Sequence, residues 1–317
     1  MPFPKPAPTV SIIVNCLNGE AYLQEALDSI SQQKFTDYEV IFVDNCSTDS
    51  TPVIARRFGE KLKYINTGKP VPLGLARNIA VSACSGAFLA FLDADDVWKP
   101  HKLEYQLELF SATEVVMTYS ACISVDRNFR ASSVLLNRSS NGRRARKLVR
   151  RTRSSLLGEY GITLSTVMLR RSVLQKLNVT FDADLTVSEE TELFLRVAQH
   201  GSVVGTSERL TFYRVYGGSA TYRTPWLFFL EAQVIKGRVR AAADALELEP
   251  SLRRFRLSAI WTQAYFNWLR GNNTSCRRIL LRTFTGSMRE WKLLLLSFFP
   301  GRAGKFLLRV MGKVTPD

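Results

Sequence analysis

Three carboxylates follow an apolar run in this chain. The run Ala87–Leu92 ends at Asp93-Ala94-Asp95-Asp96 and has no polar face, which predicts a strand buried inside an α/β sheet. Ligands of such sheets bind beyond the carboxyl ends of the strands. Acids crowded there repel one another unless a cation joins them, and oxygen ligands suit Mg²⁺ or Mn²⁺ carrying a phosphorylated substrate. The alternative interpretation is a solvated acidic turn, with Asp95 or Asp96 capping a helix that begins near Trp98.

Polar clusters also lie at the ends of three other predicted elements. They are Asn15-Cys16-Leu17-Asn18-Gly19-Glu20 after a first apolar run, Asp44-Asn45-Cys46-Ser47-Thr48-Asp49 after a second, and Gly74-Leu75-Ala76-Arg77-Asn78 at the start of a helix. In a doubly wound sheet these loops converge on one edge. We therefore expect a nucleotide to meet Asp44, Arg77 and a metal ion on Asp95 together.

The elements that must position these clusters alternate between strand and helix. Apolar runs predict strands at Thr9–Val14, Tyr38–Val43, Lys63–Ile65, Ala87–Leu92 and Val115–Tyr119, and helices at Ala21–Ile30, Pro52–Phe58 and Gly74–Ser85. This order predicts an α/β fold, with a mostly parallel, Rossmann-like sheet flanked by helices. Helical patterns at Trp226–Leu246, Leu252–Leu269, Arg277–Phe284 and Met288–Phe299 predict a helical C-terminal region.

The charge is strongly positive and unevenly placed. The 43 Lys and Arg against 28 Asp and Glu give a formal net charge of +15, and the basic residues concentrate in 127–171 and after 236. Such a surface implies an anionic partner. Nucleic acid is disfavoured because Arg143–Arg153 has no RNA-binding motif or aromatic platform. The basic, apolar tail Trp291–Lys313 either lies in a membrane interface or forms an ordinary helical pair.

Cysteine and histidine usage narrows the class of protein. Five cysteines are scattered without a C-x-x-C pair, which argues against a disulfide framework and a structural zinc site and favours a reducing cytosol. Two histidines are too few for a His-rich zinc site. The N-terminus lacks a signal peptide's apolar core, and the longest apolar run, Leu293–Phe299, is too short to span a bilayer. We expect a cytoplasmic protein, peripheral on the inner face of the plasma membrane.

Taken in order, the motifs resemble those of one family. Ser11-Ile12-Ile13-Val14 with Asn18, Glu39–Asp49, Gly74–Asn78 and Phe91–Asp96 look like the inverting family-2 glycosyltransferases of GT-A fold. Ser188–Arg196 resembles the family's "E-D-x-D-L-x-L-R" helix, and Tyr213–Ser219 its "Y-R-x-H-x-x-S" segment. The resemblance covers roughly residues 9 to 221.

That resemblance implies a reaction and a domain plan. The reaction is metal-dependent transfer of a sugar, with inversion, from a nucleotide-diphosphate sugar to a glycan or lipid-linked acceptor in cell-surface polysaccharide or glycoconjugate synthesis. UDP is the favoured nucleotide and Mn²⁺ or Mg²⁺ the cofactor. The plan is a GT-A catalytic domain at 1–225, with a nucleotide-binding half at 1–100 and an acceptor half at 101–225 that contains a basic loop at 127–158. A helical, basic region at 226–317 completes it.

Roles on the donor side follow from the resemblance, residue by residue. Asp44 accepts from the nucleotide base, with Asn15, Asn18 and Glu20 lining the same pocket. Arg77 lies near the base or the diphosphate. Asp93 approaches the ribose, with Ala94 in the same loop. Asp95 ligates the metal that bridges the diphosphate, and Asp96 is a supporting ligand or a helix cap.

On the acceptor side the chain departs from the family pattern twice. Glu190 stands where the family carries the aspartate that acts as general base, and its extra methylene shifts the reacting oxygen by more than about 1 Å. The adjacent Glu189 is the competing candidate. Tyr216 stands where the family often has a histidine, and with Arg214 and Glu192 it is assigned to the diphosphate or acceptor.

Two alternatives stay open. The departures at Glu190 and Tyr216 allow a catalytically weak nucleotide-sugar-binding protein of the same fold. Another nucleotide-diphosphate-dependent transferase, such as a nucleotidyltransferase, would normally carry an N-terminal Gly-rich, Arg- or Lys-containing phosphate loop. Asn15–Glu20 is not such a loop.

Overall fold

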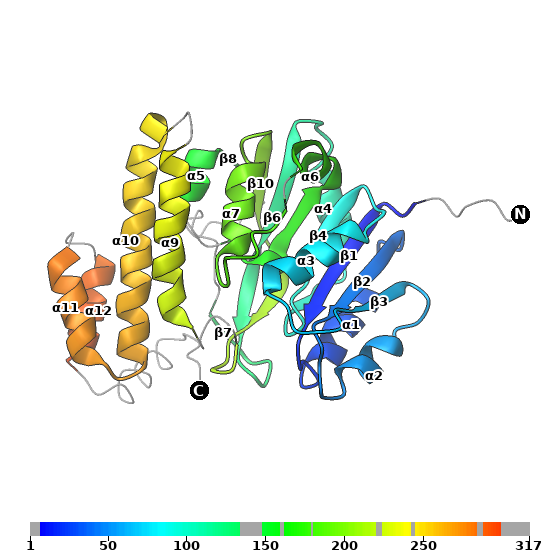
Figure 1. Cartoon of the computed structure of the whole chain (residues 1–317), viewed down its shortest axis with the longest axis horizontal. Helices are drawn as coiled ribbons and strands as arrows, with labels where there is room; N and C mark the ends of the chain where they lie inside the picture. The colour runs from blue at the N-terminus through cyan, green and yellow to red at the C-terminus, as the bar shows by residue number, and fades with distance from the viewer. Residues whose placement is uncertain are drawn as a thin grey trace, which may run out of the picture. The chain divides into compact units, whose positions relative to one another are not determined.

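The structure is a computed structural model that describes residues 7–133, 148–158, 162–178, 180–219, 224–241, 245–283 and 288–298. The chain divides into two compact units. The first comprises Met1–Ile123, Leu135–Arg153 and Gly161–Tyr213, and the second comprises Ser124–Val134, Ser154–Tyr160 and Arg214–Asp317. Figure 1 labels most of the helices and strands of both units.

The first part of the sheet is parallel. Its strands are β1 (Val10–Cys16), β2 (Tyr38–Asp44), β3 (Leu62–Asn66) and β4 (Phe88–Phe91), in the order β3-β2-β1-β4. The register places Cys16 beside Asp44 and Asp44 beside Asn66. Because parallel strands end at the same edge, the loops that follow β1, β2 and β4 begin there, as predicted.

Beyond β4 the sheet becomes antiparallel. The remaining strands are β5 (Val97–Trp98), β6 (Val115–Val125), β7 (Ala131–Ser133), β8 (Leu148–Arg151), β9 (Val167–Arg170) and β10 (Ser202–Arg214). β9 runs antiparallel to β4 and β6, β10 to β5 and β8, and β7 to β6. The predicted α/β sheet flanked by helices is confirmed, and it is a mixed sheet.

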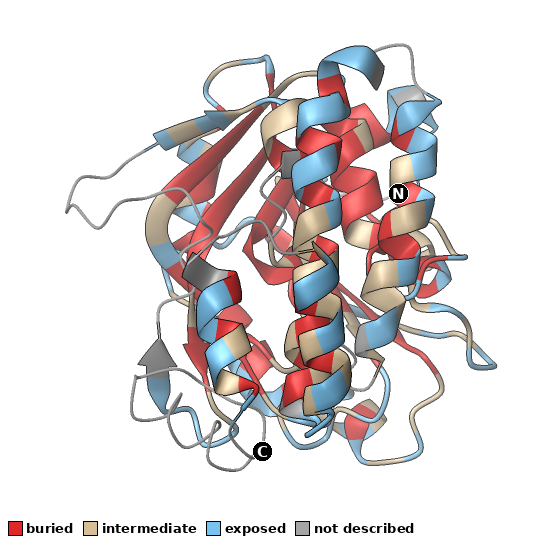
Figure 2. Ribbon diagram, turned by 90° about the vertical axis from the view of Figure 1, so that its left-hand side faces the viewer, coloured by how far each residue is buried: buried red, intermediate tan, exposed pale blue. Residues whose placement is uncertain are grey.

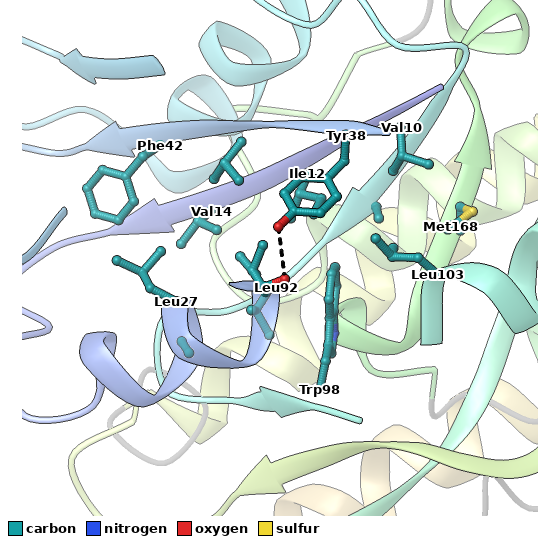
Figure 3. Close-up of a cluster of buried hydrophobic side chains, with 14 of the residues drawn as sticks. Val10, Ile12, Val14, Leu27, Tyr38, Phe42, Leu92, Trp98, Leu103 and Met168 are labelled. Carbon is teal, nitrogen blue, oxygen red and sulfur yellow. Dashed lines mark hydrogen bonds between the residues drawn. The ribbon is translucent and has the colours of Figure 1, made fainter. Parts of the chain in front are cut away.

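Helices cover both faces of the parallel strands. They are α1 (Leu23–Ser31), α2 (Thr51–Arg56), α3 (Leu73–Ser82) and α4 (Lys102–Glu108). Ile12, Val14 and Phe42 point to the face that Leu27 of α1 covers (Figure 3). Side chains alternate along a strand, so Ile13 points to the opposite face, where α3 contacts β1 and β2. Each large apolar side chain buried in these layers contributes roughly 1.5–3 kcal/mol, and the strands are mostly red in the burial colouring of Figure 2.

The helix that was expected to begin near Trp98 begins later. Val97–Trp98 forms the short strand β5, which pairs with Thr211 and Phe212 of β10, and α4 starts at Lys102. The interpretation in which Asp95 or Asp96 caps that helix is therefore wrong. A two-residue strand whose partner lies more than a hundred residues further along the chain leaves no local periodicity to detect.

The basic segment 127–158 contains regular structure where it is described. β7 and β8 lie in it, together with α5 (Arg153–Gly158). Arg143, Arg144, Arg146 and Lys147 lie outside the described residues. The first unit continues with a 3₁₀ turn (Leu164–Thr166), α6 (Arg171–Leu177) and α7 (Glu189–Val197).

The C-terminal part of the second unit is helical, as predicted. Its helices are α9 (Pro225–Arg240), α10 (Ala245–Leu269), α11 (Asn273–Thr283) and α12 (Met288–Leu296). The predicted break around Pro250 is wrong, because Pro250 lies inside α10. A proline near a helix start removes one backbone hydrogen bond, and the acceptor that loses it belongs to Leu246, whose side chain is exposed to water. No described helix is long and apolar enough to cross a membrane, and residues 299–313 of the predicted tail lie outside the described residues.

Candidate active site

Hydrogen bonds tie the loop after β1 to the loop after β2. Asn18 Oδ1 accepts from the backbone N–H of Thr48 at 2.8 Å, and Glu20 Oε2 accepts from that of Ser50 at 3.0 Å. Asn18 has a positive φ of 53°, a conformation that asparagine tolerates better than most residues. Both side chains therefore brace the loop that begins at Asp44, and their predicted contact with a nucleotide stays a prediction.

Asp44 is fully buried at the end of β2 and is held by neutral donors. Its Oδ1 accepts from the backbone N–H of Ser47 at 2.8 Å. Its Oδ2 accepts from the Tyr64 hydroxyl and from Asn66 Nδ2, the latter at 3.3 Å. The Tyr64 ring in turn stacks on Phe42, with 5.9 Å between ring centroids. These bonds orient the carboxylate and share its negative charge.

Tyr64 and Asn66 were not singled out from the sequence. Both belong to β3, and Asn66 ends that strand just as Asp44 ends β2. The signal was therefore available, because polar residues at the end of the third predicted strand must reach the same edge as Asp44. Asn15, on β1, has a buried Nδ2 that finds no acceptor in the described part of the chain, so this donor can serve a ligand.

Helix α3 fastens the segment that leads to α7. Asn78 Nδ2 donates to the carbonyl of Phe181 at 2.8 Å, and the N–H of Phe181 donates back to Asn78 Oδ1 at 2.7 Å. A Cβ at Gly74 would lie 2.5 Å from the carbonyl oxygen of Asp182, so glycine is required for this approach. The Phe181 ring packs edge-on against Phe91, with 5.8 Å between centroids. The Gly74–Asn78 motif thus links α3 to a segment about a hundred residues away.

Arg77, in the same motif, forms ion pairs with three carboxyl groups. Its Nη1 donates to Glu189 and lies 3.5 Å from Glu190 Oε2, while its Nη2 lies 3.5 Å from Asp93 Oδ1. Arg77 and Glu189 are both buried. Burial by itself lowers the pKa of the Arg77 guanidinium, but Glu189, Asp93 and Glu190 outweigh burial and raise that pKa. Arg77 is therefore a permanent cation between the loop after β4 and the start of α7.

Glu190 is partly exposed, with 19% of its side chain open to solvent, which is less than the 36% of Asp93 but far more than the buried Glu189. Burial raises the pKa of its carboxyl to about 8, the charge of Glu189 adds to the rise, and Arg77 opposes it. A carboxylate that exchanges its proton near neutral pH is suited to general base catalysis.

The acidic loop after β4 forms a tight turn. The N–H of Asp93 donates to Ser165 Oγ and that of Asp96 to the Asp93 carbonyl, both at 3.0 Å. Asp95 is partly exposed, whereas Asp96 is buried. Burial and the nearby charge of Asp96 raise the pKa of the Cys122 thiol to about 12. Asp96 therefore lies in the interior beside Cys122.

Ala94 lies in that turn and connects it to the first loop. A Cβ built on Gly19 would be 3.7 Å from Ala94 Cβ, so the loops after β1 and β4 touch. In the described residues no group of three or more His, Cys, Asp or Glu side chains is arranged to hold a metal ion. The donor set here, chiefly Asp95, fits an ion that takes most of its oxygen ligands from phosphate and water.

The remaining predicted site residues have other partners. Glu192 is buried and accepts from Arg196 Nε at 2.9 Å and from Arg196 Nη2 at 2.5 Å. Arg214 and Tyr216 belong to the second unit, where Arg214 Nη1 donates to the carbonyl of Arg127 at 3.0 Å. Their predicted contacts with diphosphate or acceptor stay predictions.

Comparison with known proteins identifies the family of this arrangement. The family model described as "Glycosyl transferase family 2" matches residues 11–178. The chain is 28% identical over 173 residues to the Escherichia coli protein "UDP-Glc:alpha-D-GlcNAc-diphosphoundecaprenol beta-1,3-glucosyltransferase WfgD". That match covers 54% of this chain and 64% of WfgD. Three further curated relatives are matched over 66%, 46% and 33% of their own length.

Two solved structures share the fold. Residues 1–349 of Staphylococcus aureus TarS in complex with UDP-GlcNAc superpose with a TM-score of 0.61 at 19% identity, covering 91% of this chain and 79% of that one. The mannosyltransferase PcManGT from Pyrobaculum calidifontis, in complex with GDP-Man and Mn²⁺, gives 0.62 at 17% identity, covering 96% and 87%.

Proposed function

The chain belongs to glycosyl transferase family 2, and we propose that it moves a sugar from a UDP-sugar to a glycan or lipid-linked acceptor with inversion, in cell-surface polysaccharide or glycoconjugate synthesis. The observation that carries this proposal is the cluster in which Arg77 holds Glu189 and Glu190 beside Asp93. It sets a proton acceptor next to the loop after β4, where a phosphorylated donor is expected.

The nucleotide and the acceptor are proposed from relatives and from the buried groups. TarS has been crystallised with UDP-GlcNAc, and the name of WfgD includes UDP-Glc and a diphosphoundecaprenol acceptor. In this chain the oriented carboxylate of Asp44 would accept the imide N–H of uracil, and Asn15 Nδ2 would donate to the same nucleotide. We assign catalysis to residues 1–225, and we propose a cytoplasmic, membrane-peripheral location, where a lipid-linked acceptor would be within reach.

The geometry of the acids supports one order of proton transfer. Glu190, ionised at the moment of reaction, takes the proton of the acceptor hydroxyl while that oxygen bonds to the anomeric carbon. The bond from that carbon to the diphosphate breaks on the opposite face, so the configuration inverts. Glu189 stays bound to Arg77 and keeps the start of α7 in place. Glu190 ends the step protonated, and the nucleoside diphosphate leaves.

A divalent cation fits the donor side of this site. Asp95 is the carboxylate that would hold it, because Asp93 faces Arg77 and Asp96 is buried. Bound there, Mn²⁺ or Mg²⁺ would neutralise charge on the departing diphosphate. In PcManGT, Mn²⁺ accompanies GDP-Man.

Substitution of Glu190 tests the proposed base. Glu190→Gln keeps the size of the side chain and removes the proton acceptor, so we expect unchanged affinity for UDP and transfer reduced by about 10²–10⁴-fold. Sugar transfer and UDP binding are measured separately. Glu190→Asp then asks whether the site is adapted to the longer side chain, in which case shortening it also lowers the rate.

Glu189→Gln is the matched control. It should lower transfer less than Glu190→Gln does. Normal turnover of Glu190→Gln together with an inactive Glu189→Gln would move the base to Glu189. Donor binding without transfer or hydrolysis in the wild type, over a panel of acceptors, would favour the nucleotide-sugar-binding alternative.

Asp95→Asn tests the cation site. We expect the variant to fold normally and to lose the increase in UDP affinity that Mn²⁺ produces in the wild type. Titration calorimetry with and without Mn²⁺ measures this directly. If Mn²⁺ increased the UDP affinity of the variant as much as that of the wild type, Asp95 would not be a ligand of the ion.

A further inference from the structure

Helices α11 and α12 expose an apolar stripe in the second unit. Trp291, Leu295 and Phe298 follow one another at helical spacing, and the exposed fractions of these residues and of Leu281 on α11 lie between 49% and 67%. The opposite side of α12 is buried, with Leu293 packed in the core of this unit. Trp291 and Leu295 belong to α12, and Phe298 lies in the turn directly after it. Single exposed apolar residues are ordinary, but a row of three is not.

A contact between the two helices places Leu281 next to this stripe. Arg277 on α11 donates from Nη1 to the carbonyl of Ser297 at 2.8 Å, and its guanidinium carbon lies 5.0 Å from the centroid of the Phe298 ring. Leu281 lies one turn after Arg277 on the same face of α11. The exposed apolar side chains of α11 and α12 therefore form one surface, which we call the α11–α12 surface.

Positive charge surrounds the α11–α12 surface. Arg278 and Arg282 on α11 and Lys292 on α12 are exposed. Between residues 273 and 298 the sequence has five basic residues and a single acidic one, Glu290, which is buried. A tryptophan, leucines and a phenylalanine flanked by arginine and lysine are the composition of helices that lie in a membrane interface.

We propose that the α11–α12 surface docks on an anionic lipid surface, with the apolar stripe entering the acyl boundary and the flanking cations meeting the headgroups. The positive charge around this surface favours an anionic bilayer over a protein partner. An unknown protein or a second copy of the chain would have to supply matching acidic groups, whereas an anionic bilayer presents them everywhere. In a second copy the same surface would bring its own cations against these.

This docking deepens the proposed function in one respect, since it rests on a lipid-linked acceptor being found at a membrane. It remains a separate property of the chain, because vesicle binding needs neither donor nor transfer. Its failure would leave the glycosyltransfer proposal intact, and inactivity of the enzyme would leave the docking intact.

Vesicle binding by the full-length protein tests the proposal. We expect co-sedimentation with phosphatidylcholine vesicles that contain phosphatidylglycerol, weak binding to phosphatidylcholine alone, and loss of binding at high salt. The triple variant Trp291→Ser, Leu295→Ser, Phe298→Ser should lower the partition coefficient by about tenfold or more. Each of Arg278→Gln, Arg282→Gln and Lys292→Gln should lower it by up to about fivefold.

Two further variants serve as controls for this test. Leu246→Ser replaces an exposed leucine on α10, away from this surface, and should bind vesicles like the wild type. Leu295→Ser alone covers the case in which the triple variant unfolds. The proposal would be overturned if the apolar variants and the charge variants partitioned onto the vesicles as strongly as the wild type does. So would unchanged vesicle binding combined with a change of oligomeric state in light scattering, which would assign the surface to contact between copies.

Discussion

Arg77 and Lys102 are buried basic residues of the first unit in opposite surroundings. Arg77 reaches Glu189, Glu190 and Asp93. Lys102, at the start of α4, is fully buried, and in the described part of the chain no carboxylate pairs with it. Its Nζ donates to Gln106 Oε1 at 2.6 Å and lies 4.1 Å from the centroid of the Trp98 ring.

The difference shows what burial does to a charge with and without partners. Burial lowers the pKa of Lys102 well below its ordinary value, and nothing opposes that effect. Around Arg77 the same cost is outweighed by the neighbouring acids, Glu189 first and then Asp93 and Glu190, and the pKa of Arg77 rises. Arg77 therefore works as a fixed charge at the site, whereas Lys102 can be neutral and acts through its hydrogen bond and its packing. Four predictions test this contrast.

The largest effect is expected from Arg77→Leu. Removal of the cation leaves the buried carboxylate of Glu189 uncompensated, which typically costs about 3–5 kcal/mol of unfolding free energy. Urea denaturation measures that cost. Arg150→Leu is the control, because Arg150 pairs with Glu114 on the exposed surface, where water screens the pair, and this variant should lose far less stability. Equal costs would show that the Arg77 cluster is not energetically special.

The next effect concerns pH and the pair Glu189–Glu190. Because the base must be ionised, kcat/KM should fall about tenfold per pH unit below the Glu190 pKa of about 8. The unfolding free energy should change with pH in the opposite direction to kcat/KM. The folded state keeps the Glu190 proton up to about pH 8, whereas the unfolded chain releases it near 4.5, so the unfolding free energy falls as pH rises through that window. In Glu190→Gln the unfolding free energy should fall less over this pH window than it does in the wild type. The same pH dependence of the unfolding free energy in both proteins would contradict the raised pKa of Glu190.

A smaller effect is expected from Lys102→Met. The variant keeps the apolar stem but leaves the buried Oε1 of Gln106 without its donor, at a cost of about 1–3 kcal/mol. In the wild type, the lowered pKa of Lys102 makes stability rise with pH between that value and its ordinary 10.5, because the unfolded state binds the proton more tightly. The cost of the variant should therefore shrink as pH falls. A cost that grows on acidification would mean that Lys102 is charged and stabilised.

The smallest effect is expected at Asp44, a buried carboxylate that has neutral donors in place of a cation. Tyr64→Phe removes one of three donors and should cost about 0.5–1.5 kcal/mol, because Ser47 and Asn66 still hold the carboxylate. Uridine diphosphate should also bind more weakly if the orientation of Asp44 matters. Calorimetry of UDP binding separates this effect from stability, and unchanged affinity would limit Tyr64 to packing on Phe42.

Local patterns in the sequence determined the parallel half of the sheet and the position of its loops. Apolar runs and helical spacing are short-range signals, so β1 to β4 and α1 to α3 lie within a few residues of their expected places. Parallel strands end at one edge, and this places the predicted polar clusters after β1, β2 and β4 there. The motifs resembling family 2 were equally local, and the family was predicted correctly from them.

Tertiary packing decided which side chains of the candidate site contact one another and which are buried. The sequence separates Arg77 from Glu189 by 112 residues, and only the packing of the Phe181 segment on α3 makes them an ion pair. The strand at Val97–Trp98 exists because β10 pairs with it. Burial of Asp96 and Lys102, and the raised pKa of Glu190, depend on surrounding atoms contributed by distant segments. Desolvation and charge pairing depend on distance in space, and residue spacing along a chain does not specify that distance.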